Sequence, residues 1–236
     1  MKRTVLVLAI LMLAGCVSTA PPPSAPIPKP DHVSTPVNSQ QAQVRFRQVA
    51  SRVEPAAERE CRRRTQGVNC DFLIRIHSNT QAPSNAYQSL SKSGRPVITM
   101  TRALIKDVNN NDELAFVMSH EAAHHIQGHL ARRAQNAAAG AIIFAGLATI
   151  AGTGTNDIAA AQDLGAFVGG RSYSKDFELE ADRLGTVIAY KAGYDPIKGA
   201  LYFARVPDPG DRFLGTHPPN AQRYYAVQAT IARIGG

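Results

Sequence analysis

Tryptophan is missing from this 236-residue chain, and aromatic residues make up only 6% of it. The 26 lysines and arginines are dispersed among 18 acidic residues, giving a formal net charge of +8. Nucleic-acid-binding surfaces usually combine a clustered basic patch with aromatic side chains that stack on bases. The sequence therefore predicts no nucleic-acid partner, while the modest positive excess favours anionic lipid headgroups.

A long hydrophobic run of the kind that crosses a bilayer is also missing. The longest uncharged apolar stretch of the mature chain, residues 137–150, has fourteen residues, and a spanning helix needs roughly twenty. We expect residues 137–150 to form a buried core helix. The alternative is a flexible apolar flap beside a cleft or against a membrane surface, because glycines weaken helical order.

Only three cysteines are present, and the first ends a short N-terminal signal. Lys2 and Arg3 precede an apolar segment, Val5 to Leu13, and small residues lead to Cys16. This pattern resembles a bacterial lipoprotein signal peptide over residues 1–15, with lipid attached to Cys16. Val17 in place of aspartate favours sorting to the outer membrane. The alternative is an N-terminal membrane anchor followed by an unmodified cysteine.

Residues 16–39 contain seven prolines and predict a semi-rigid tether rather than a helix or a central strand. The remaining residues, 40–236, are long enough for one domain with a substantial core. A lipid on Cys16 would hold this domain in the periplasm. In that oxidising space the remaining pair, Cys61 and Cys70, is expected to form a disulfide, with two independent buried thiols as the alternative.

The most informative motif is His120-Glu121-Ala122-Ala123-His124, an HExxH pentapeptide. By chance it is expected in fewer than about one in a hundred chains of this composition. Residues four apart share one face of a helix, so both imidazoles can bind one Zn²⁺, and the carboxylate of Glu121 can take a proton from a water that the metal activates. The alternative is a pair of hydrogen-bonded histidines on a buried helix.

Flanking residues predict a helix around this motif, from an N-cap at Asn110 or Asn111, with Glu113 in a capping-box position, to Arg132 and Arg133. His125 and His129 are expected on another face of this helix or at the surface.

A catalytic zinc usually has a third protein ligand. The metzincin motif is excluded because Gln127 and Leu130 replace the glycine and histidine that it requires. Glu178 is the best remaining donor, since an ExxxD pair places it on one helical face with Asp182, which could orient a ligating imidazole. Spacing alone is weak evidence, and a solvated helix face is the alternative.

The complete set of motifs resembles the HtpX-like and CAAX-prenyl-protease-type zinc metallopeptidases, which are HExxH…ExxxD gluzincins, and in particular a periplasmic lipoprotein branch. The resemblance covers residues 72–223, and three separated motifs occur in the family's order. They are HExxH at 120–124, the Tyr173–Gly185 string with Glu178 and Asp182, and Thr216-His217-Pro218 followed by Arg223.

The resemblance implies one Zn²⁺ per chain bound by His120, His124 and Glu178, with Glu121 as general base and proton donor and Asp182 beside a zinc histidine. His217 and Arg223 would lie near the metal, to stabilise an oxyanion or to plug the open zinc position. The alternative is a turn at residues 216–219 with Arg223 at the surface.

We expect a mostly helical α+β zincin-type domain with a small sheet. Residues 41–64 and 221–234 are predicted helices, and residues 72–76 a strand. The strand ending at Met100 is expected to be an edge strand that binds an extended peptide, as in zincins generally.

These features favour a zinc metalloendopeptidase that is lipid-anchored at the bacterial outer membrane, faces the periplasm, and hydrolyses misfolded or damaged envelope proteins. Two alternatives remain. One is an envelope assembly factor or chaperone with a plugged zinc site, and the other is a lipoprotein scaffold with a structural metal.

Overall fold

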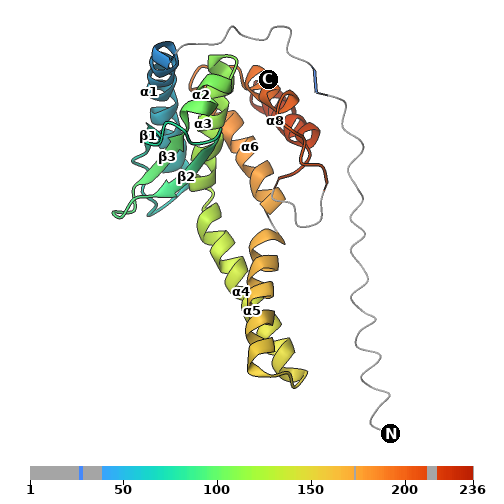
Figure 1. Cartoon of the computed structure of the whole chain (residues 1–236). Helices are drawn as coiled ribbons and strands as arrows, with labels where there is room; N and C mark the ends of the chain where they lie inside the picture. Colours follow the sequence, from blue (N-terminus) through green and yellow to red (C-terminus); the bar gives the residue numbers. More distant parts are fainter. Residues whose placement is uncertain (1–26, 29–38, 173, 212–216, 236) are drawn as a thin grey trace.

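The computed structural model describes residues 27–28, 39–172, 174–211 and 217–235, in which one small sheet lies at one side of a set of helices (Figure 1). The expected class, a mostly helical α+β fold, is confirmed. In chain order the elements are α1 (Ser39–Arg64), β1 (Leu73–Ile76), β2 (Ala86–Leu90), β3 (Pro96–Met100), α2 (Arg102–Asp107), α3 (Asn111–Ile126), α4 (His129–Ile150), α5 (Thr155–Ser172), α6 (Ser174–Lys191), α7 (Pro196–Ala200), the 3₁₀ helix η1 (Leu201–Ala204) and α8 (Asn220–Ile234).

Helix α3, which carries the HExxH motif, is the central element of the fold. It packs against α6, α1, α7 and the strands β2 and β3. Ten of its sixteen residues are buried, among them Leu114 and Met118 at 0% exposure. The main core therefore surrounds α3, joining α1, the sheet, α2 and α6, while a smaller cluster on the side of Phe116 joins α7, η1 and α8.

The start of α3 follows the expected capping box. The Asn110 side chain accepts a hydrogen bond from the Glu113 backbone N–H at 2.8 Å, and the Glu113 carboxylate accepts one from the Asn109 N–H at 2.7 Å. Glu113 is fully buried and also pairs with Arg205, so burial does not leave its charge without a partner.

The end of α3 differs from the prediction. The helix ends at Ile126 rather than at Arg132 and Arg133, because Gly128 adopts a left-handed conformation (φ 66°) that stops the helical hydrogen-bond ladder. Helix α4 begins directly afterwards, so both arginines lie in its first turns. This change of direction at Gly128 also reorients His129.

The sheet has the strand order β1-β3-β2, with β3 parallel to β1 and antiparallel to β2. The expectation that the strand ending at Met100 lies at an edge is wrong. All five residues of β3 are buried, and both of its sides are paired. The free edge nearest the HExxH helix belongs to β2.

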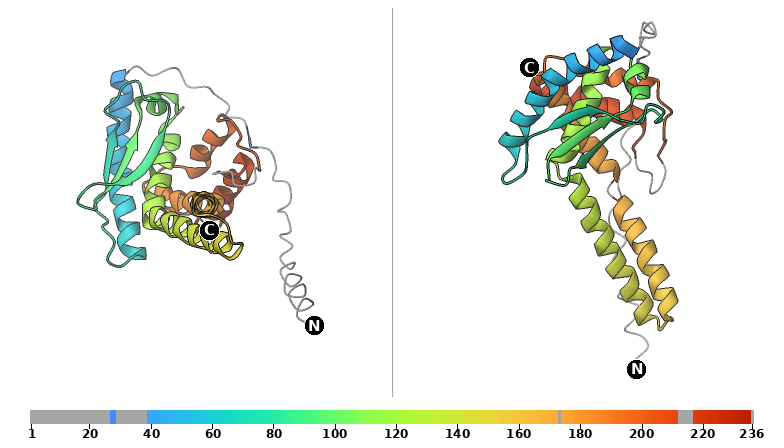
Figure 2. Two further views of the ribbon diagram at one scale, coloured as in Figure 1. Left: turned by 60° about the horizontal axis from the view of Figure 1, so that its bottom comes forward. Right: turned by 60° about the vertical axis from the view of Figure 1, so that its left-hand side comes forward.

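The interpretation of residues 137–150 as a core helix is also wrong. They form most of α4, which packs along α5 in a two-helix arm that projects from one end of the domain (Figures 1 and 2). Ile142 is 74% exposed and Ile150 is 86% exposed. Within the described ranges, no helix combines the length and the apolar character needed to cross a bilayer.

The other element predictions are mostly confirmed. Helices occupy residues 39–64 and 220–234, and a strand occupies residues 73–76. The signal peptide at 1–15 and nearly all of the tether at 16–39 lie outside the described residues. Ile27 is described, and it packs against the smaller cluster beside α7 and α8.

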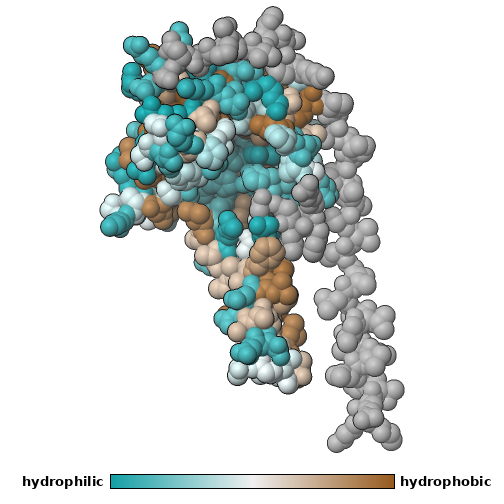
Figure 3. All heavy atoms as spheres, in the orientation of Figure 1, coloured by the Kyte–Doolittle hydropathy of each residue, from teal (hydrophilic) through white to brown (hydrophobic). Residues whose placement is uncertain are grey.

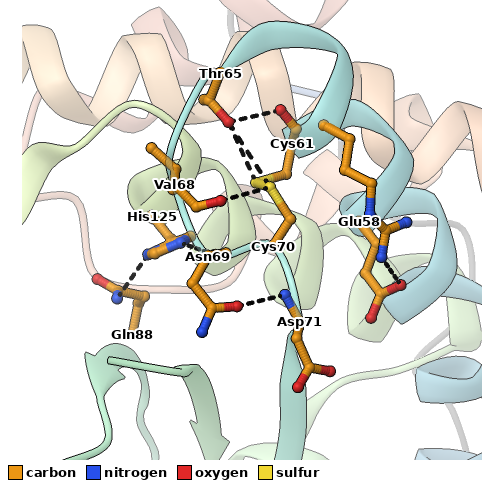
Figure 4. Close-up of a disulfide and its surroundings, with 10 residues drawn as sticks. Glu58, Cys61, Thr65, Val68, Asn69, Cys70, Asp71, Gln88 and His125 are labelled. Atoms are coloured by element: carbon orange, nitrogen blue, oxygen red, sulfur yellow. Dashed lines mark hydrogen bonds and ion pairs between the residues drawn. A yellow bond between two sulfur atoms is a disulfide. The ribbon is translucent and has the colours of Figure 1, made fainter. Parts of the chain in front are cut away.

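Cys61 and Cys70 form a disulfide with a Cα–Cα distance of 5.7 Å. The bond joins the end of α1 to the segment that leads into β1 (Figure 4). Next to it, the carbonyl of Asn69 accepts a hydrogen bond from His125 at 2.8 Å. The disulfide therefore fixes a loop that also contacts the HExxH helix.

Replacing Cys61 and Cys70 together by alanine should lower the free energy of unfolding by about 2–3 kcal/mol, because the loop that the disulfide closes regains its entropy in the unfolded chain. Urea unfolding followed by far-UV circular dichroism measures this difference. A pair of unlinked buried thiols would instead give a parent whose stability does not change on adding a reductant.

Candidate metal centre

Three side chains from two helices converge at the centre of the domain. His120 and His124 lie one turn apart on α3, and Glu178 faces them from α6. Each offers one ligand atom, and these atoms lie within 4.8 Å of one another. The structure thus brings together the three residues that the sequence motifs suggest as metal ligands.

The separations between these atoms suit a small tetrahedral cation. The two histidine Nε2 atoms are 3.0 Å apart, and they lie 3.4 Å and 3.3 Å from the Glu178 carboxylate oxygens. Bonds of roughly 2.0–2.1 Å to zinc imply ligand separations of about 3.3 Å in a tetrahedron. Nitrogen and carboxylate donors are also the set that zinc prefers, so the residues present fit this metal.

Asp182 lies directly behind the first histidine. It is fully buried one turn after Glu178, and its carboxylate is 3.0 Å from His120 Nδ1. Donation of the Nδ1 proton to this carboxylate leaves the Nε2 lone pair of His120 pointing at the centre. Such a bond fixes both the tautomer and the ring orientation of a metal-binding histidine.

Arg223, from α8, holds the Asp182 carboxylate in place. Its guanidinium makes two hydrogen bonds to Asp182, at 2.8 Å and 2.7 Å, and lies 3.4 Å from a Glu178 oxygen. The interpretation of Arg223 as a surface residue is wrong, since its side chain is 11% exposed and packs on the Phe203 ring. A buried bidentate pair of this kind offsets the cost of burying both charges.

The electrostatics of the cluster favour a positive charge at its centre. Burial lowers the pKa of His120, but the carboxylates of Asp182 and Glu178 outweigh this effect and raise the pKa to about 10. Burial raises the pKa of Glu178, yet hydrogen bonds from His120 and His124 hold it well below the usual range. The carboxylate is therefore ionised at neutral pH, as a metal ligand must be.

His129 has a place that the sequence did not indicate. It was expected on another helix face or at the surface, but it is 4% exposed and its Nδ1 lies 2.8 Å from Nδ1 of His124. Its Nε2 lies 3.1 Å from the Glu180 carboxylate, and its ring stacks on Phe177. The break at Gly128 causes this difference, because helical spacing does not carry across it.

The contacts of His129 define its protonation. Burial lowers its pKa to about 4, and Glu180 opposes this only in part, so the ring is neutral at pH 7. A neutral ring that donates Nε2–H to Glu180 accepts from His124 Nδ1–H. That arrangement leaves the Nε2 lone pair of His124 facing the centre, as Asp182 does for His120.

Glu180 is in turn held by Arg132, through bonds of 2.5 Å and 3.2 Å. Arg132 also lies over the Phe177 ring, 4.3 Å from its centroid. Each histidine of the centre is therefore backed by a carboxylate and an arginine, directly for His120 and through His129 for His124.

His125 differs from its neighbours. It lies on the opposite side of α3, where it contacts Asn69 beside the disulfide, Gln88 and the Phe72 ring (Figure 4). Its position on another face of the helix agrees with the prediction.

A cavity of about 460 Å³ opens beside the centre. Its walls include Glu121, the segment Asn85–Gln88 at the start of β2, and Leu130 and Arg133 at the base of the arm. A second cavity of about 220 Å³ shares the lining residues His120, Glu121 and His217 with the first. Glu121 thus borders both cavities, and β2 forms one wall of the larger.

His217 lines both cavities. Its side chain is 52% exposed, and its Nε2 lies 3.6 Å from a Glu178 oxygen. Thr216, the residue before it in the motif, lies outside the described residues.

The family model for peptidase family M48 matches residues 43–231 of this chain. The chain belongs to peptidase family M48. Members of this family are metallopeptidases and are generally zinc-dependent, which agrees with the two histidines and the carboxylate that converge here.

One relative is a protein of Vibrio cholerae serotype O1 (strain ATCC 39315 / El Tor Inaba N16961) named "Putative beta-barrel assembly-enhancing protease". It is 32% identical to this chain over 132 residues, which cover 52% of this chain and 26% of that protein. The match therefore spans about a quarter of the relative's length.

Replacing His129 by alanine should weaken zinc binding by about 10- to 100-fold, because the His124 ring loses the partner that fixes its tautomer. Competition with a chromophoric chelator measures the affinity. His125→Ala is the matched control, four residues away in sequence and bonded to a backbone carbonyl instead; it should bind zinc as the parent does. Equal affinities for both variants would contradict the assigned role of His129.

Proposed function

We propose that this chain is a zinc-dependent endopeptidase of the bacterial envelope, anchored at the outer membrane by a lipid on Cys16 and facing the periplasm. The observation that carries the proposal is the position of Glu121. Glu121 lines the cavity together with His120, His124 and Glu178, and residues of β2 line the same cavity.

In this proposal His120, His124 and Glu178 hold one Zn²⁺, which polarises the scissile carbonyl and makes water more acidic. Glu121 takes the proton from the attacking water and later delivers it to the leaving amine. Asp182 and His129 keep the two imidazoles in the tautomer that presents Nε2. Arg223 keeps Asp182 ionised and lies close enough to Glu178 to steady its carboxylate.

We infer that the substrate binds in extended form along β2. This strand lies at the edge of the sheet next to the cavity, and an extended peptide can add to such an edge through backbone hydrogen bonds. Recognition through the backbone requires an unfolded segment. This favours misfolded or damaged envelope proteins as substrates. The name of the Vibrio relative links that protein to β-barrel assembly, which also takes place in the envelope.

A second candidate function is that of an envelope assembly factor or chaperone whose zinc site is plugged. The observation that favours it is the 3.6 Å distance between His217 Nε2 and Glu178. A histidine at that position could fill the open coordination position, and the chain would then bind clients with little cleavage.

Glu121→Gln should bind zinc as the parent does but cleave an unfolded protein at least about 100-fold more slowly, because the amide cannot accept the proton. His124→Ala should lose both zinc and activity. Zinc content measured by atomic absorption and cleavage of reduced, alkylated casein followed by gel separate these effects.

Unchanged cleavage by Glu121→Gln would reject the enzymatic proposal. Chelation should abolish cleavage while far-UV circular dichroism keeps its helical signal, because the core around α3 does not depend on the metal. Unfolding on chelation would instead indicate a structural metal.

If His217 plugs the site, His217→Ala should raise the rate of casein cleavage several-fold, because the open position becomes available to water and substrate. His77→Ala changes a half-buried histidine directly after β1; it serves as the control and should not change the rate. An unchanged or lower rate for His217→Ala would exclude the plug.

A further inference from the structure

The arm formed by α4 and α5 extends well beyond the catalytic part of the domain (Figures 1 and 2). With 22 residues at 1.5 Å each, α4 is about 33 Å long. Among the residues that the structure describes, α4 and α5 pack mainly against each other beyond the base of the arm. The large apolar side chains of the arm do not belong to the domain core, so packing in that core does not explain them.

The arm has small residues between its two helices and large apolar side chains on its outside, whereas a helix pair in water has the opposite arrangement. Glycines lie at the seam, where a Cβ on Gly140 would be 2.1 Å from the carbonyl oxygen of Gly165, and one on Gly169 would be 2.1 Å from that of Asn136. Large apolar side chains point outward: Ile142, Ile143, Leu147, Ile150, Leu164 and Phe167 are 51–86% exposed. Small residues inside and large apolar ones outside are typical of helices in contact with lipid.

Charge along the arm follows the same pattern. No Asp, Glu, Lys or Arg occurs from Ala134 to Asn156, a stretch that includes most of α4 and the turn to α5. Basic residues return at the base, with Arg133 exposed and Arg171 above the Phe167 ring. Asp157 and Asp163 are the acidic residues of α5, and in Figure 3 the apolar surface follows the arm while its tip is more polar.

The apolar face does not point into the catalytic cavity. Leu130 lines that cavity, whereas Ile142, Ile143 and Ile150 lie about 120°, 220° and 200° around the helix from it, at 100° per residue. The peptide being cleaved is therefore a poor candidate for the occupant of this face.

The length of the N-terminal segment indicates which surface the arm meets. Eleven peptide steps separate Cys16 from Ile27, which packs on the domain, and they span at most about 40 Å. If Cys16 carries lipid, as the proposed function has it, the bilayer lies within a distance of the domain that is close to the length of the arm.

We propose that the α4–α5 arm is a membrane-docking element that lies along a phospholipid bilayer, with the outward aliphatic side chains of α4 among the acyl chains. Interfacial helices bind in this way, without crossing the bilayer. The basic residues at the base then face the headgroups. Docking fixes the orientation of the cavity at the membrane surface, where unassembled envelope proteins expose apolar segments.

The test uses the mature chain, residues 16–236, with Cys16→Ser, so that neither a lipid nor the apolar segment Val5 to Leu13 contributes, and flotation with vesicles of phosphatidylethanolamine and phosphatidylglycerol. The parent should float with the vesicles. A variant with Ile142→Glu and Ile150→Glu should float about tenfold less or worse. The control carries Val44→Glu and Tyr225→Glu, which replace exposed apolar side chains elsewhere, at 50% and 63% exposure, and should float as the parent does.

A parent that does not float, or equal flotation of the two double variants, would overturn the proposal. So would a vesicle-free parent that is dimeric by light scattering and becomes monomeric with Ile142→Glu and Ile150→Glu, because the face would then bind a second copy. Casein cleavage measured on the same samples is independent of docking. Flotation without cleavage would reject the proposed function and leave the arm's role intact.

Discussion

The close packing of α6 against α3 is the constraint on which the rest of the structure depends. A Cβ on Gly185 would lie 3.0 Å from the backbone of His120, so a glycine at this position lets the two helices approach. This approach brings Glu178 within 3.4 Å of both histidines and Asp182 within 3.0 Å of His120. Burial of Leu114, Met118 and Ile188 around the contact supplies apolar free energy that holds the polar cluster together.

Burying so many ionisable groups is costly unless each has a partner. Two parallel chains of contacts, with members from α4, α6 and α8, supply these partners. Arg223 and Asp182 support His120, while Arg132, Glu180 and His129 support His124. Both chains end at an imidazole whose free lone pair faces the same point. A cation at that point would be bound by the two imidazoles and by the carboxylate of Glu178.

Much of this arrangement could be predicted from the sequence. Short-range signals were sufficient for the capping box at the start of α3, and the cysteine count for the disulfide between Cys61 and Cys70. Glu178 followed from the family resemblance, because ExxxD spacing alone is weak evidence. Three features could not be predicted in this way. His129 depends on a left-handed glycine that redirects the chain. The central position of β3 depends on its parallel pairing with β1, from which β2 separates it in the sequence. The apolar stretch in α4 has the composition of a core helix, and only the tertiary structure shows that it packs along α5 and leaves large apolar side chains exposed.

The central claim is that one zinc ion is held jointly by α3 and α6. X-ray absorption spectroscopy at the zinc edge of the loaded full-length chain tests it most directly. The account predicts one zinc per chain with two imidazole nitrogens and a carboxylate oxygen at about 2.0–2.2 Å, and loss of one oxygen from the first coordination sphere in Glu178→Ala. A spectrum unchanged by that substitution would show that α6 does not bind the metal and would contradict the account.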